Sequence, residues 1–254
     1  MQFISWNVNG LRSIYKKGFL NWFKETMPDV LCIQETKAHE EQLPEEIRKV
    51  SGYHAYFSYP ERKGYSGVAL YTKAGPNSIE NSFYDNTIDD EGRIIISCFD
   101  KFTLMNIYFP NGKMSQDRLD YKLEFYKAFL DECKLRMERG EELVVCGDVN
   151  TAHKETDIAR PKQNEKVSGF LPVEREWLDR FIGGGLVDTF RMHTKEGGHY
   201  SWWDYKTRAR ERNIGWRIDY FFVSKGIAKN TKASYMLSDV MGSDHCPIAL
   251  EMEI

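Results

Sequence analysis

The stretch EELVVCGDVN (Glu141–Asn150) determines how the rest of the chain is interpreted. Its apolar run Leu143–Cys146 is typical of a buried strand. Gly147 lets the backbone turn closely, and Asp148 and Asn150 then lie on the same side because side chains alternate along an extended segment. A carboxylate and an amide at the end of a strand suit oxygen chemistry on a phosphate or at a hard metal ion. Taken alone, the pattern is more often a simple Asp-X-Asn turn.

Two other predicted strands also end in polar side chains, which favours the chemical interpretation. FISWNV (Phe3–Val8) carries Asn7 near its end and is followed by Asn9. DVLCIQE (Asp29–Glu35) is an apolar run that ends in the carboxylate of Glu35. The same pattern, an apolar strand with a polar exit, therefore occurs three times.

Hard cations take oxygen ligands, and Mg²⁺ usually needs only one or two protein carboxylates, together with water and substrate phosphate. Glu35, Asp148 and Asp244 are candidates, because each follows an apolar run or a Gly-Ser turn where strand ends can converge. For Glu35 the alternative is a solvated loop residue. For Asp244 it is an Asx turn before Pro247.

An Asp–His pair is expected in the C-terminal part of the chain. Asp219 lies inside the otherwise apolar segment GWRIDYFFVS (Gly215–Ser224), where an unpaired carboxylate would be costly. His245 is its natural partner, because an aspartate can fix the tautomer of an imidazole and stabilise its charged form. The alternative is a buried histidine satisfied by the backbone. The sequence has no Gly-x-Ser-x-Gly nucleophile motif, so water is the better nucleophile.

The composition is that of an ordinary globular protein, with 41% hydrophobic and 29% charged residues among 254. The net charge of −3 predicts that any contact with a polyanion comes from local patches. The five cysteines form no C-x-x-C pair and no zinc-type spacing, which favours reduced thiols in a cytosolic protein. The N-terminus lacks signal-peptide features and no run approaches the ~20 apolar residues of a membrane span, so a soluble intracellular protein is expected.

Hydrophobic periodicity predicts many strands and fewer helices. The helices are expected over Gly18–Met27, Glu40–Val50, Leu119–Arg136 and Pro172–Phe181. Besides the strands above, others are expected over Tyr53–Tyr59, Ser66–Thr72, Arg93–Phe99, Phe102–Tyr108 and His199–Trp203, with a last one at the end of the chain. Residues 151–170 are expected to be a polar loop. Because no linker separates these elements, residues 1–254 are expected to form one α/β domain with two packed sheets and helices outside.

Aromatic and basic residues concentrate in one part of the sequence. Trp202, Trp203 and Trp216 flank the basic segment KTRARER (Lys206–Arg212). Aromatic side chains beside cations suit an extruded nucleotide and its phosphates. A core tryptophan cluster beside a solvated loop is the alternative, with about half the weight. Tyr108, at the end of its predicted strand, can donate to a phosphate oxygen or can simply pack at an interface.

Six motifs spread along the chain carry a resemblance to a known family. They are SWNVNGLR (Ser5–Arg12), LCIQETK (Leu31–Lys37), NIYFPNG (Asn106–Gly112), GDVNTAH (Gly147–His153), NIGWRIDYFFVS (Asn213–Ser224) and GSDHCPI (Gly242–Ile248). With them the chain resembles, nearly end to end, the exonuclease III family of abasic-site endonucleases in the DNase I-like endonuclease/exonuclease/phosphatase superfamily. GDxN and SDHxP are shared across that superfamily. QETK, YFPNG with the following Arg118-Leu119-x-Tyr121-Lys122, and GWRIDYF are the motifs that indicate DNA repair.

The resemblance implies a four-layer α/β sandwich, with two mixed β-sheets packed between helices, and it implies roles for individual residues. The implied metal site consists of Asn7, Glu35, Asp148, Asn150, Asp244 and His245. The implied catalytic groups are Tyr108, Asp148, Asn150, Asp219 and His245, with Asp148 activating water and Asp219 orienting His245. The implied apolar pocket for the abasic sugar consists of Trp202, Trp216 and Ile218. The implied DNA contacts are Asn9, Arg12, Lys37, Arg118 and Asn164.

The resemblance further implies Mg²⁺-dependent cleavage, with Mn²⁺ able to substitute, of the phosphodiester 5′ to an abasic site in duplex DNA. The products would be a 3′-hydroxyl and a 5′-deoxyribose phosphate, with some 3′–5′ exonuclease or 3′-phosphodiesterase activity besides. The expected partner is double-stranded DNA with abasic or blocked 3′ sites. A monomer that is cytoplasmic, nucleoid-associated and not bound to a membrane is expected, with a bacterial or archaeal source favoured.

Two positions depart from the family pattern, and two other functions compete. Asn9 stands where some members have aspartate, which lowers the local negative charge. Val167 stands where the eukaryotic-type enzymes often have asparagine, which places the DNA contacts of that loop in doubt. One competing function is a phosphatase acting on a lipid or small molecule. The other is a DNA-binding module without activity, which metal-dependent nicking would exclude.

Overall fold

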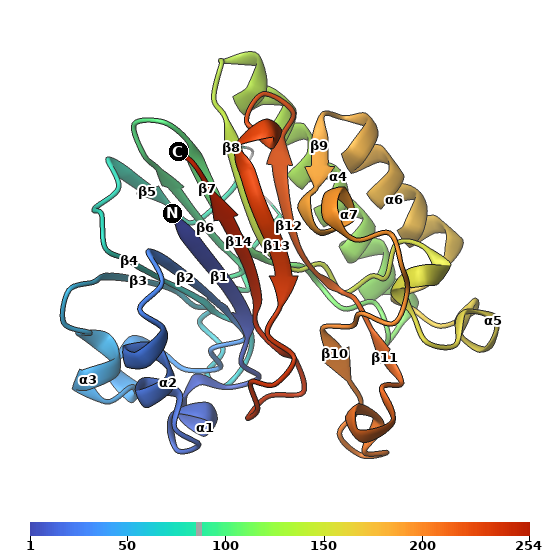
Figure 1. The fold of residues 1–254 in the computed structure, drawn as a ribbon, viewed down its shortest axis with the longest axis horizontal. Helices are drawn as coiled ribbons and strands as arrows, with labels where there is room; N and C mark the ends of the chain where they lie inside the picture. Colours follow the sequence, from blue (N-terminus) through green and yellow to red (C-terminus); the bar gives the residue numbers. More distant parts are fainter. Residues whose placement is uncertain (85–87) are drawn as a thin grey trace.

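The computed structural model describes residues 1–84 and 88–254, and their strands form two large mixed sheets (Figure 1). The first sheet has the order β13 (Thr231–Met236), β14 (Ile248–Met252), β1 (Gln2–Asn7), β2 (Val30–Gln34), β4 (Val68–Thr72) and β3 (His54–Ser58). The second has the order β5 (Ser78–Glu80), β6 (Ile94–Cys98), β7 (Thr103–Tyr108), β8 (Leu143–Asp148), β12 (Asp219–Ser224) and β9 (Leu186–Asp188). A separate ribbon pairs β10 (Trp202–Trp203) with β11 (Gly215–Trp216).

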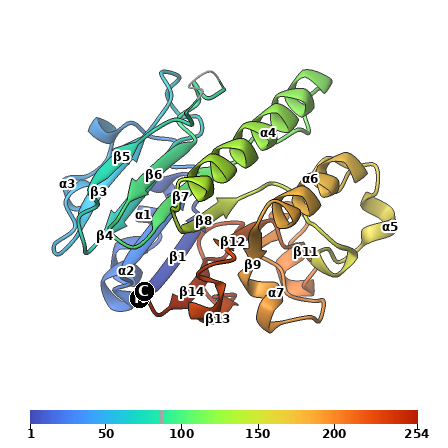
Figure 2. The ribbon, with the colours of Figure 1, turned by 90° about the horizontal axis from the view of Figure 1, so that it is seen from above.

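Helices cover the outer faces of both sheets (Figure 2). Those packed on the first sheet are α1 (Leu11–Tyr15), α2 (Phe19–Thr26) and α3 (Glu45–Arg48). Those packed on the second are α4 (Gln116–Glu138) and α6 (Pro172–Gly183). The shorter elements are α5 (Pro161–Asn164), α7 (Thr189–His193) and the 3₁₀ turns η1 (Glu40–Gln42), η2 (Glu155–Asp157), η3 (Ala209–Arg212) and η4 (Ala228–Asn230).

The apolar strands form this sandwich because they are buried on both faces. In β2, Val30 and Cys32 pack in the core between the sheets, whereas Leu31 and Ile33 pack under the helices of the first sheet. A strand buried on both faces gives a continuous apolar run rather than an alternating one. The layers are therefore helix, sheet, sheet and helix, which confirms the predicted four-layer α/β sandwich.

Strand pairing brings the polar residues predicted at the strand ends to one edge of the sheets. β8 lies parallel to β7 and antiparallel to β12, so that Asp148 pairs with Tyr108 on one side and with Asp219 on the other. Side chains that pair in register point to the same face of a sheet. In the first sheet β1 lies parallel to β2, and Asn7 pairs with Gln34, one residue before Glu35.

Two predicted elements are divided in the structure, each for an identifiable reason. The helix expected over Glu40–Val50 is instead η1 and α3, with Pro44 between them, because a proline disfavours helical backbone in the residue before it. The strand expected over Gly215–Ser224 is divided into β11 and β12. The interruption lies at Arg217, whose backbone N–H donates to the Asp157 carbonyl at 2.7 Å.

Other predicted boundaries also need correction. Only Trp202–Trp203 of the strand expected over His199–Trp203 is extended, and the loop expected over 151–170 contains η2 and α5. The structure also contains α1, α7, β5 and β13, none of which the pattern predicted. All five cysteines have free thiols. Among the helices of the described residues, none has the length and apolar character that crossing a membrane requires.

Candidate active site

Polar side chains from both sheets meet at one end of the sandwich. Asn7, which ends β1, donates from Nδ2 to Asp148 Oδ2 at 2.9 Å and to Glu35 Oε1 at 3.2 Å. Tyr108, which ends β7, donates its hydroxyl to the same Oε1 of Glu35. The convergence of strand ends predicted from the sequence is therefore present, and it links the two sheets directly.

The backbone at these strand ends is unusual. Four residues have φ between +47° and +57°, in the left-handed region that residues other than glycine rarely adopt: Asn9, Glu35, Lys37 and Asn150. Strained backbone of this kind persists only where the surroundings hold it, and it concentrates at functional sites. At Asn150 the backbone N–H donates to Asp148 Oδ1 at 2.8 Å, so the turn also fixes the carboxylate.

The expected Asp–His pair is present and buried. His245 Nδ1 lies 2.8 Å from Asp219 Oδ2, and its other ring nitrogen, Nε2, lies 3.9 Å from Asp148 Oδ2. Burial alone would lower the pKa of His245. The charge of Asp219 and its hydrogen bond outweigh burial, and with Asp148 and Asp244 nearby the pKa rises to about 10. His245 is therefore a charged imidazolium at neutral pH.

Asp148 lies where negative charge exceeds positive charge. Its burial and the neighbouring charges of Asp219 and Glu35 raise its pKa to about 7, although the charge of His245 acts in the opposite direction. A carboxyl group with a pKa near neutrality can gain or lose a proton under physiological conditions. Asp148 thus has the protonation behaviour of a general base.

Glu35 is held ionised by a neighbouring cation. Lys37 Nζ lies 2.7 Å from Glu35 Oε2. Burial raises the pKa of Glu35, but the charge and hydrogen bond of Lys37 and the hydrogen bond from Tyr108 lower it overall. Burial and the charge of Glu35 hold the pKa of Tyr108 well above its usual value. Tyr108 therefore stays a neutral donor.

Asp244 joins the same site from the loop before β14. Its Oδ1 accepts from Asn9 Nδ2 at 2.9 Å, and its Oδ2 accepts from Trp202 Nε1 at 3.0 Å. Burial raises the pKa of Asp244, but the charge of His245 and these two hydrogen bonds lower it overall. Asp244 therefore connects the carboxylate cluster to the tryptophan ribbon.

A recess with one apolar wall opens at the carboxylates. Trp202 and Trp216 face each other across the β10–β11 ribbon at right angles, with ring centroids 6.1 Å apart, and they pack with the buried Ile218. A cavity of about 200 Å³ opens there. Its lining residues are Glu35, Asn111, Lys113, Asp148, Asn150, Ser168, Gly169, Trp202, Trp216, Ile218, Asp244 and His245.

The structure separates the three tryptophans of the aromatic and basic region. Trp202 and Trp216 line the cavity, whereas Trp203 is 4% exposed, donates to Asn213 Oδ1 and lies under the guanidinium of Arg210. The core interpretation is therefore correct for Trp203. Arg210 itself binds the carbonyl oxygens of residues 238 and 240.

None of the five predicted DNA-contacting residues is among those that line the cavity. Arg12 lines a separate hollow with Lys37, and Asn164 ends α5 and donates to the Arg160 carbonyl at 2.7 Å. Arg118, near the start of α4, is held by Glu91 at 2.9 Å. Their contact with DNA stays a prediction.

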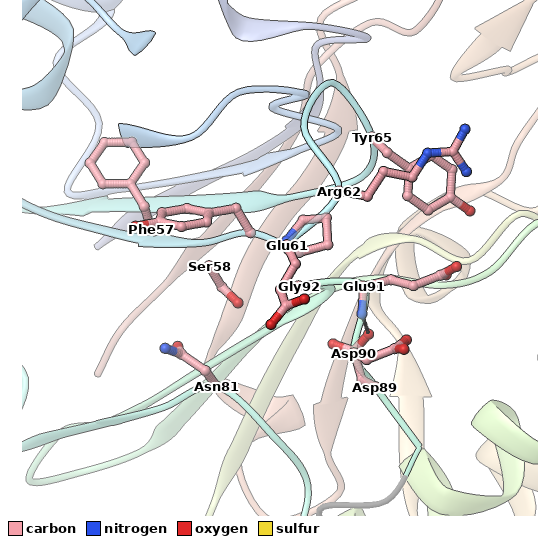
Figure 3. A pocket seen from close by; sticks show the side chains of 12 residues that line it. Phe57, Ser58, Glu61, Arg62, Tyr65, Asn81, Asp89, Asp90, Glu91 and Gly92 are labelled. Atoms are coloured by element: carbon pink, nitrogen blue, oxygen red, sulfur yellow. Dashed lines mark hydrogen bonds between the residues drawn. The ribbon is translucent and has the colours of Figure 1, made fainter. Parts of the chain in front are cut away.

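A larger cavity, of about 790 Å³, is drawn in Figure 3. It is bounded by the loop after β3 and by the segment before β6, and Tyr65 and Glu91 line it. Both of these residues accept hydrogen bonds from Arg118. None of the residues predicted for the site lines this cavity, although its walls fix Arg118.

Three residues of the site were missed by the sequence interpretation. Asn111 donates to Asn150 Oδ1 at 3.1 Å, and Lys113 lines the cavity. Lys122 is fully buried and donates from Nζ to the Asn150 carbonyl at 2.8 Å and to Glu174 at 2.7 Å. Its position on the apolar face of α4, one turn before Tyr126, was a usable signal, because a lysine on a buried face needs a carboxylate partner.

The donor groups of the site fit a metal ion. The ligand atoms of Asp148, Asp219 and His245 lie within 4.8 Å of one another. His245 Nδ1 is hydrogen bonded to Asp219, and a hard cation prefers oxygen ligands such as the carboxylates of Glu35 and Asp148. A divalent cation would neutralise the excess negative charge that raises the pKa of Asp148. The described residues thus form a buried acidic site suited to a metal.

Comparison with known proteins identifies the class. Residues 4–245 match the profile of the Endonuclease/Exonuclease/phosphatase family, and the chain belongs to this family and is a phosphodiester hydrolase. It is 41% identical over 259 residues to the exodeoxyribonuclease of Bacillus subtilis (strain 168), with 100% of both chains covered. It is 40% identical to the DNA repair nuclease APEX1 of Danio rerio, covering 100% of this chain and 83% of that one. The structure of an AP endonuclease from Archaeoglobus fulgidus superposes with a TM-score of 0.90 at 28% identity, covering 100% of both chains.

Proposed function

We propose that this protein is a DNA-repair endonuclease that hydrolyses the phosphodiester 5′ to an abasic site in duplex DNA. One observation carries the proposal: Asp148 and the imidazolium of His245, 3.9 Å apart, both line a cavity walled by Trp202 and Trp216. A sugar without its base can enter that cavity while the phosphate beside it stays at Asp148. The names of the relatives, an exodeoxyribonuclease and a DNA repair nuclease, agree with DNA as the substrate.

The size of the cavity supports selection of an abasic nucleotide. At about 200 Å³ it is smaller than the ~300–1,000 Å³ of typical ligand pockets. Gly169 forms part of the wall, and a Cβ atom there would lie 3.1 Å from the Trp216 ring. An abasic nucleotide is also the cheapest to extrude, because it has no base to unstack or unpair.

The chemistry follows from the protonation states. Asp148, with a pKa of about 7, accepts a proton from the attacking water. The imidazolium of His245, oriented by Asp219, donates to a phosphoryl oxygen and stabilises the charge that develops there. Tyr108 and Asn150 are further donors at the same strand ends. The water oxygen forms a bond to phosphorus, the bond from phosphorus to the 3′-oxygen of the preceding nucleotide breaks, and that oxygen takes up a proton, which gives a 3′-hydroxyl and a 5′-deoxyribose phosphate.

We propose Mg²⁺ as the ion, with Mn²⁺ as a substitute, held by Glu35 with Asn7, Asp148, Asn150 and Asp244. When bound, the ion supplies charge neutralisation at the phosphoryl and leaving oxygens. In the free protein Lys37 already neutralises part of Glu35. Titration calorimetry with MgCl₂ should therefore give tighter binding to Lys37→Met than to the wild type, and weaker binding to Glu35→Gln.

The finer assignments are part of the same proposal. The substrate is double-stranded DNA with abasic or blocked 3′ sites, and some 3′–5′ exonuclease activity accompanies the nicking. The protein acts as a monomer, with residues 1–254 as one domain. A cytoplasmic, nucleoid-associated location agrees with the five free cysteines.

The test is cleavage of a labelled duplex that carries one tetrahydrofuran abasic analogue, with Mg²⁺ and with EDTA. An intact duplex and a 3′-recessed duplex are incubated in parallel. We expect a single Mg²⁺-dependent nick 5′ to the analogue, no cut in the intact duplex, and a ladder on the recessed duplex that measures the exonuclease share. The absence of cleavage on all three duplexes would contradict the proposal and direct attention to lipid or small-molecule phosphate esters.

A further inference from the structure

Lys113 was not predicted as a site residue, yet its ammonium group lies over the recess. Nζ is 5.1 Å from the centroid of the Trp202 ring and 5.5 Å from that of Trp216. An ammonium group within about 6 Å of an aromatic face is attracted by the ring quadrupole. Lys113 therefore covers both aromatic walls in the free protein.

Three other cations of the site and its surroundings are neutralised by carboxylates, and Lys113 is not. Lys37 is paired with Glu35, Arg118 with Glu91, and Lys122 with Glu174, each at 2.7 to 2.9 Å. Within residues 1–84 and 88–254, Lys113 Nζ makes neither a hydrogen bond nor an ion pair. It is also the one lysine or arginine among the described residues that line the cavity. Its charge is thus available to a ligand.

The backbone that carries Lys113 is fixed to the catalytic residues. The Lys113 N–H donates to Asn111 Oδ1 at 2.9 Å, and Asn111 donates to Asn150 Oδ1 at 3.1 Å. Gly112 is packed so closely that a Cβ atom there would lie 2.8 Å from Ser168 Oγ. The side chain of Lys113 itself is exposed. Because its backbone is held and its side chain is exposed, the ammonium group of Lys113 can move without disturbing the turn at Asn150.

We infer that Lys113 is a phosphate-binding residue that determines access to the recess. When the extruded sugar enters, the ammonium leaves the two indole faces and binds a phosphate that flanks the extruded nucleotide. A charge-assisted hydrogen bond to phosphate is stronger than an exposed contact with an aromatic face, so the exchange favours substrate entry. This inference rests on the proposed function, because it requires a DNA substrate at the cavity.

The experiment measures kcat/KM for nicking of the tetrahydrofuran duplex between about 50 and 200 mM salt. Three variants are compared with the wild type: Lys113→Met, Lys113→Arg, and Lys134→Met as the matched control. Lys134 is an exposed lysine of α4 that has no part in the site. We expect Lys113→Met to lower kcat/KM about tenfold at the lowest salt concentration. It should also reduce the slope of log(kcat/KM) against log(salt) by about one, as loss of one phosphate contact does.

The controls separate this role from simple packing on the tryptophans. Lys113→Arg keeps the charge and should keep the slope, and Lys134→Met should leave both the rate and the slope unchanged. If Lys113→Met has the salt dependence of Lys134→Met while the wild type nicks normally, the inference is wrong and the proposed function stands. If the wild type fails to nick the duplex, the proposed function is wrong and this inference falls with it.

Discussion

The cluster around Arg217 and the cluster around His245 are both buried and both combine aspartates with cations, but their charges balance differently. Arg217 binds Asp157 at 2.7 Å and Asp188 at 2.7 Å, and Arg191 also binds Asp157. Two arginines thus face two aspartates. Burial raises the pKa of Asp157, but the charge of Arg217 outweighs it and lowers the pKa to about 2. Every charge in this cluster has a partner.

In the second cluster one imidazolium faces several carboxylates. His245 Nδ1 lies 2.8 Å from Asp219 Oδ2, whereas Nε2 of the same ring lies 3.9 Å from Asp148 Oδ2. The pKa of Asp148 consequently rises to about 7 through burial and like charge. The comparison teaches that burial by itself does not make an aspartate reactive. A deficit of positive charge leaves Asp148 able to exchange a proton, whereas the balanced cluster only stabilises the fold.

The largest expected effect comes from breaking the balanced cluster. Arg217→Met leaves Asp157 and Asp188 buried with one cation fewer, and loss of one partner of a buried pair typically costs ~3–5 kcal/mol. Urea unfolding followed by circular dichroism should give a free energy of unfolding lower by that amount. Arg180→Met, which removes an exposed pair with Glu176, is the control and should change stability by less than about 1 kcal/mol. Equal effects of the two variants would show that the Arg217 cluster is not a structural one.

The second effect comes from removing the unbalanced carboxylate. Asp148→Asn keeps the shape of the side chain but only one of the two hydrogen bonds that Asp148 accepts, because Asn7 donates to Oδ2, the Asn150 backbone donates to Oδ1, and an amide has one acceptor oxygen. Removal of a group that acts in the transition state typically lowers the rate ~10²–10³-fold. We expect a loss of kcat of that size on the tetrahydrofuran duplex, with the free energy of unfolding changed by no more than about 2 kcal/mol, because the loss of one hydrogen bond opposes the removal of a buried charge. Full activity in a folded Asp148→Asn protein would exclude Asp148 as the base.

The same comparison explains which parts of the site could be predicted from the sequence. Asp219 and Arg217 are both charged residues in an apolar strand pattern. The need of Asp219 for a partner was recognised because His245 belongs to a known type of pair. The partners of Arg217 come from η2 and from the end of β9, which no local pattern relates to residue 217. The sequence therefore predicted one long strand where a buried arginine interrupts it.

The fold class could be predicted because it depends on local signals, namely apolar runs, polar strand exits and amphipathic helices. The missed elements are short or weakly apolar. β5 has three residues, and α7 has five and follows directly on β9. Lys113 could not be predicted, because the two tryptophans that its ammonium group contacts lie 89 and 103 residues further along the chain and come near it only in the folded protein.

The third effect is a difference in pH dependence between the clusters. Asp157 has a pKa of about 2 in the folded protein against 3.8 as the ordinary value, so its stabilisation is complete above pH 3.8 and is lost as the pH falls through about 2. It amounts to about 2 kcal/mol. His245 has a pKa of about 10 against 6.5, so its stabilisation is complete below pH 6.5 and is lost as the pH rises through about 10.

Urea unfolding at a series of pH values separates these two contributions. Asp157→Asn should flatten the loss of stability between about pH 4 and pH 2 and leave the alkaline side unchanged. His245→Asn should flatten the loss between about pH 7 and pH 10, a window above the pKa of Asp148, and leave the acid side unchanged. An alkaline slope that survives in His245→Asn would mean that another group titrates there.

The smallest effect concerns the segment that joins the two clusters. Trp216 faces the cavity, whereas the next residue, Arg217, faces the balanced cluster. Trp216→Ala therefore removes a wall of the recess and leaves both sets of charges in place. We expect kcat/KM on the tetrahydrofuran duplex to fall about tenfold, as the loss of roughly 50 Å² of apolar contact with the sugar would give at ~25 cal/mol per Å², and degradation of a 3′-recessed duplex to fall less. Trp177→Ala, which removes a tryptophan packed on α4 away from the cavity, should affect both substrates equally. Equal losses in Trp216→Ala would mean that the recess positions every phosphodiester alike, and that selection of abasic sites comes from extrusion rather than from fit.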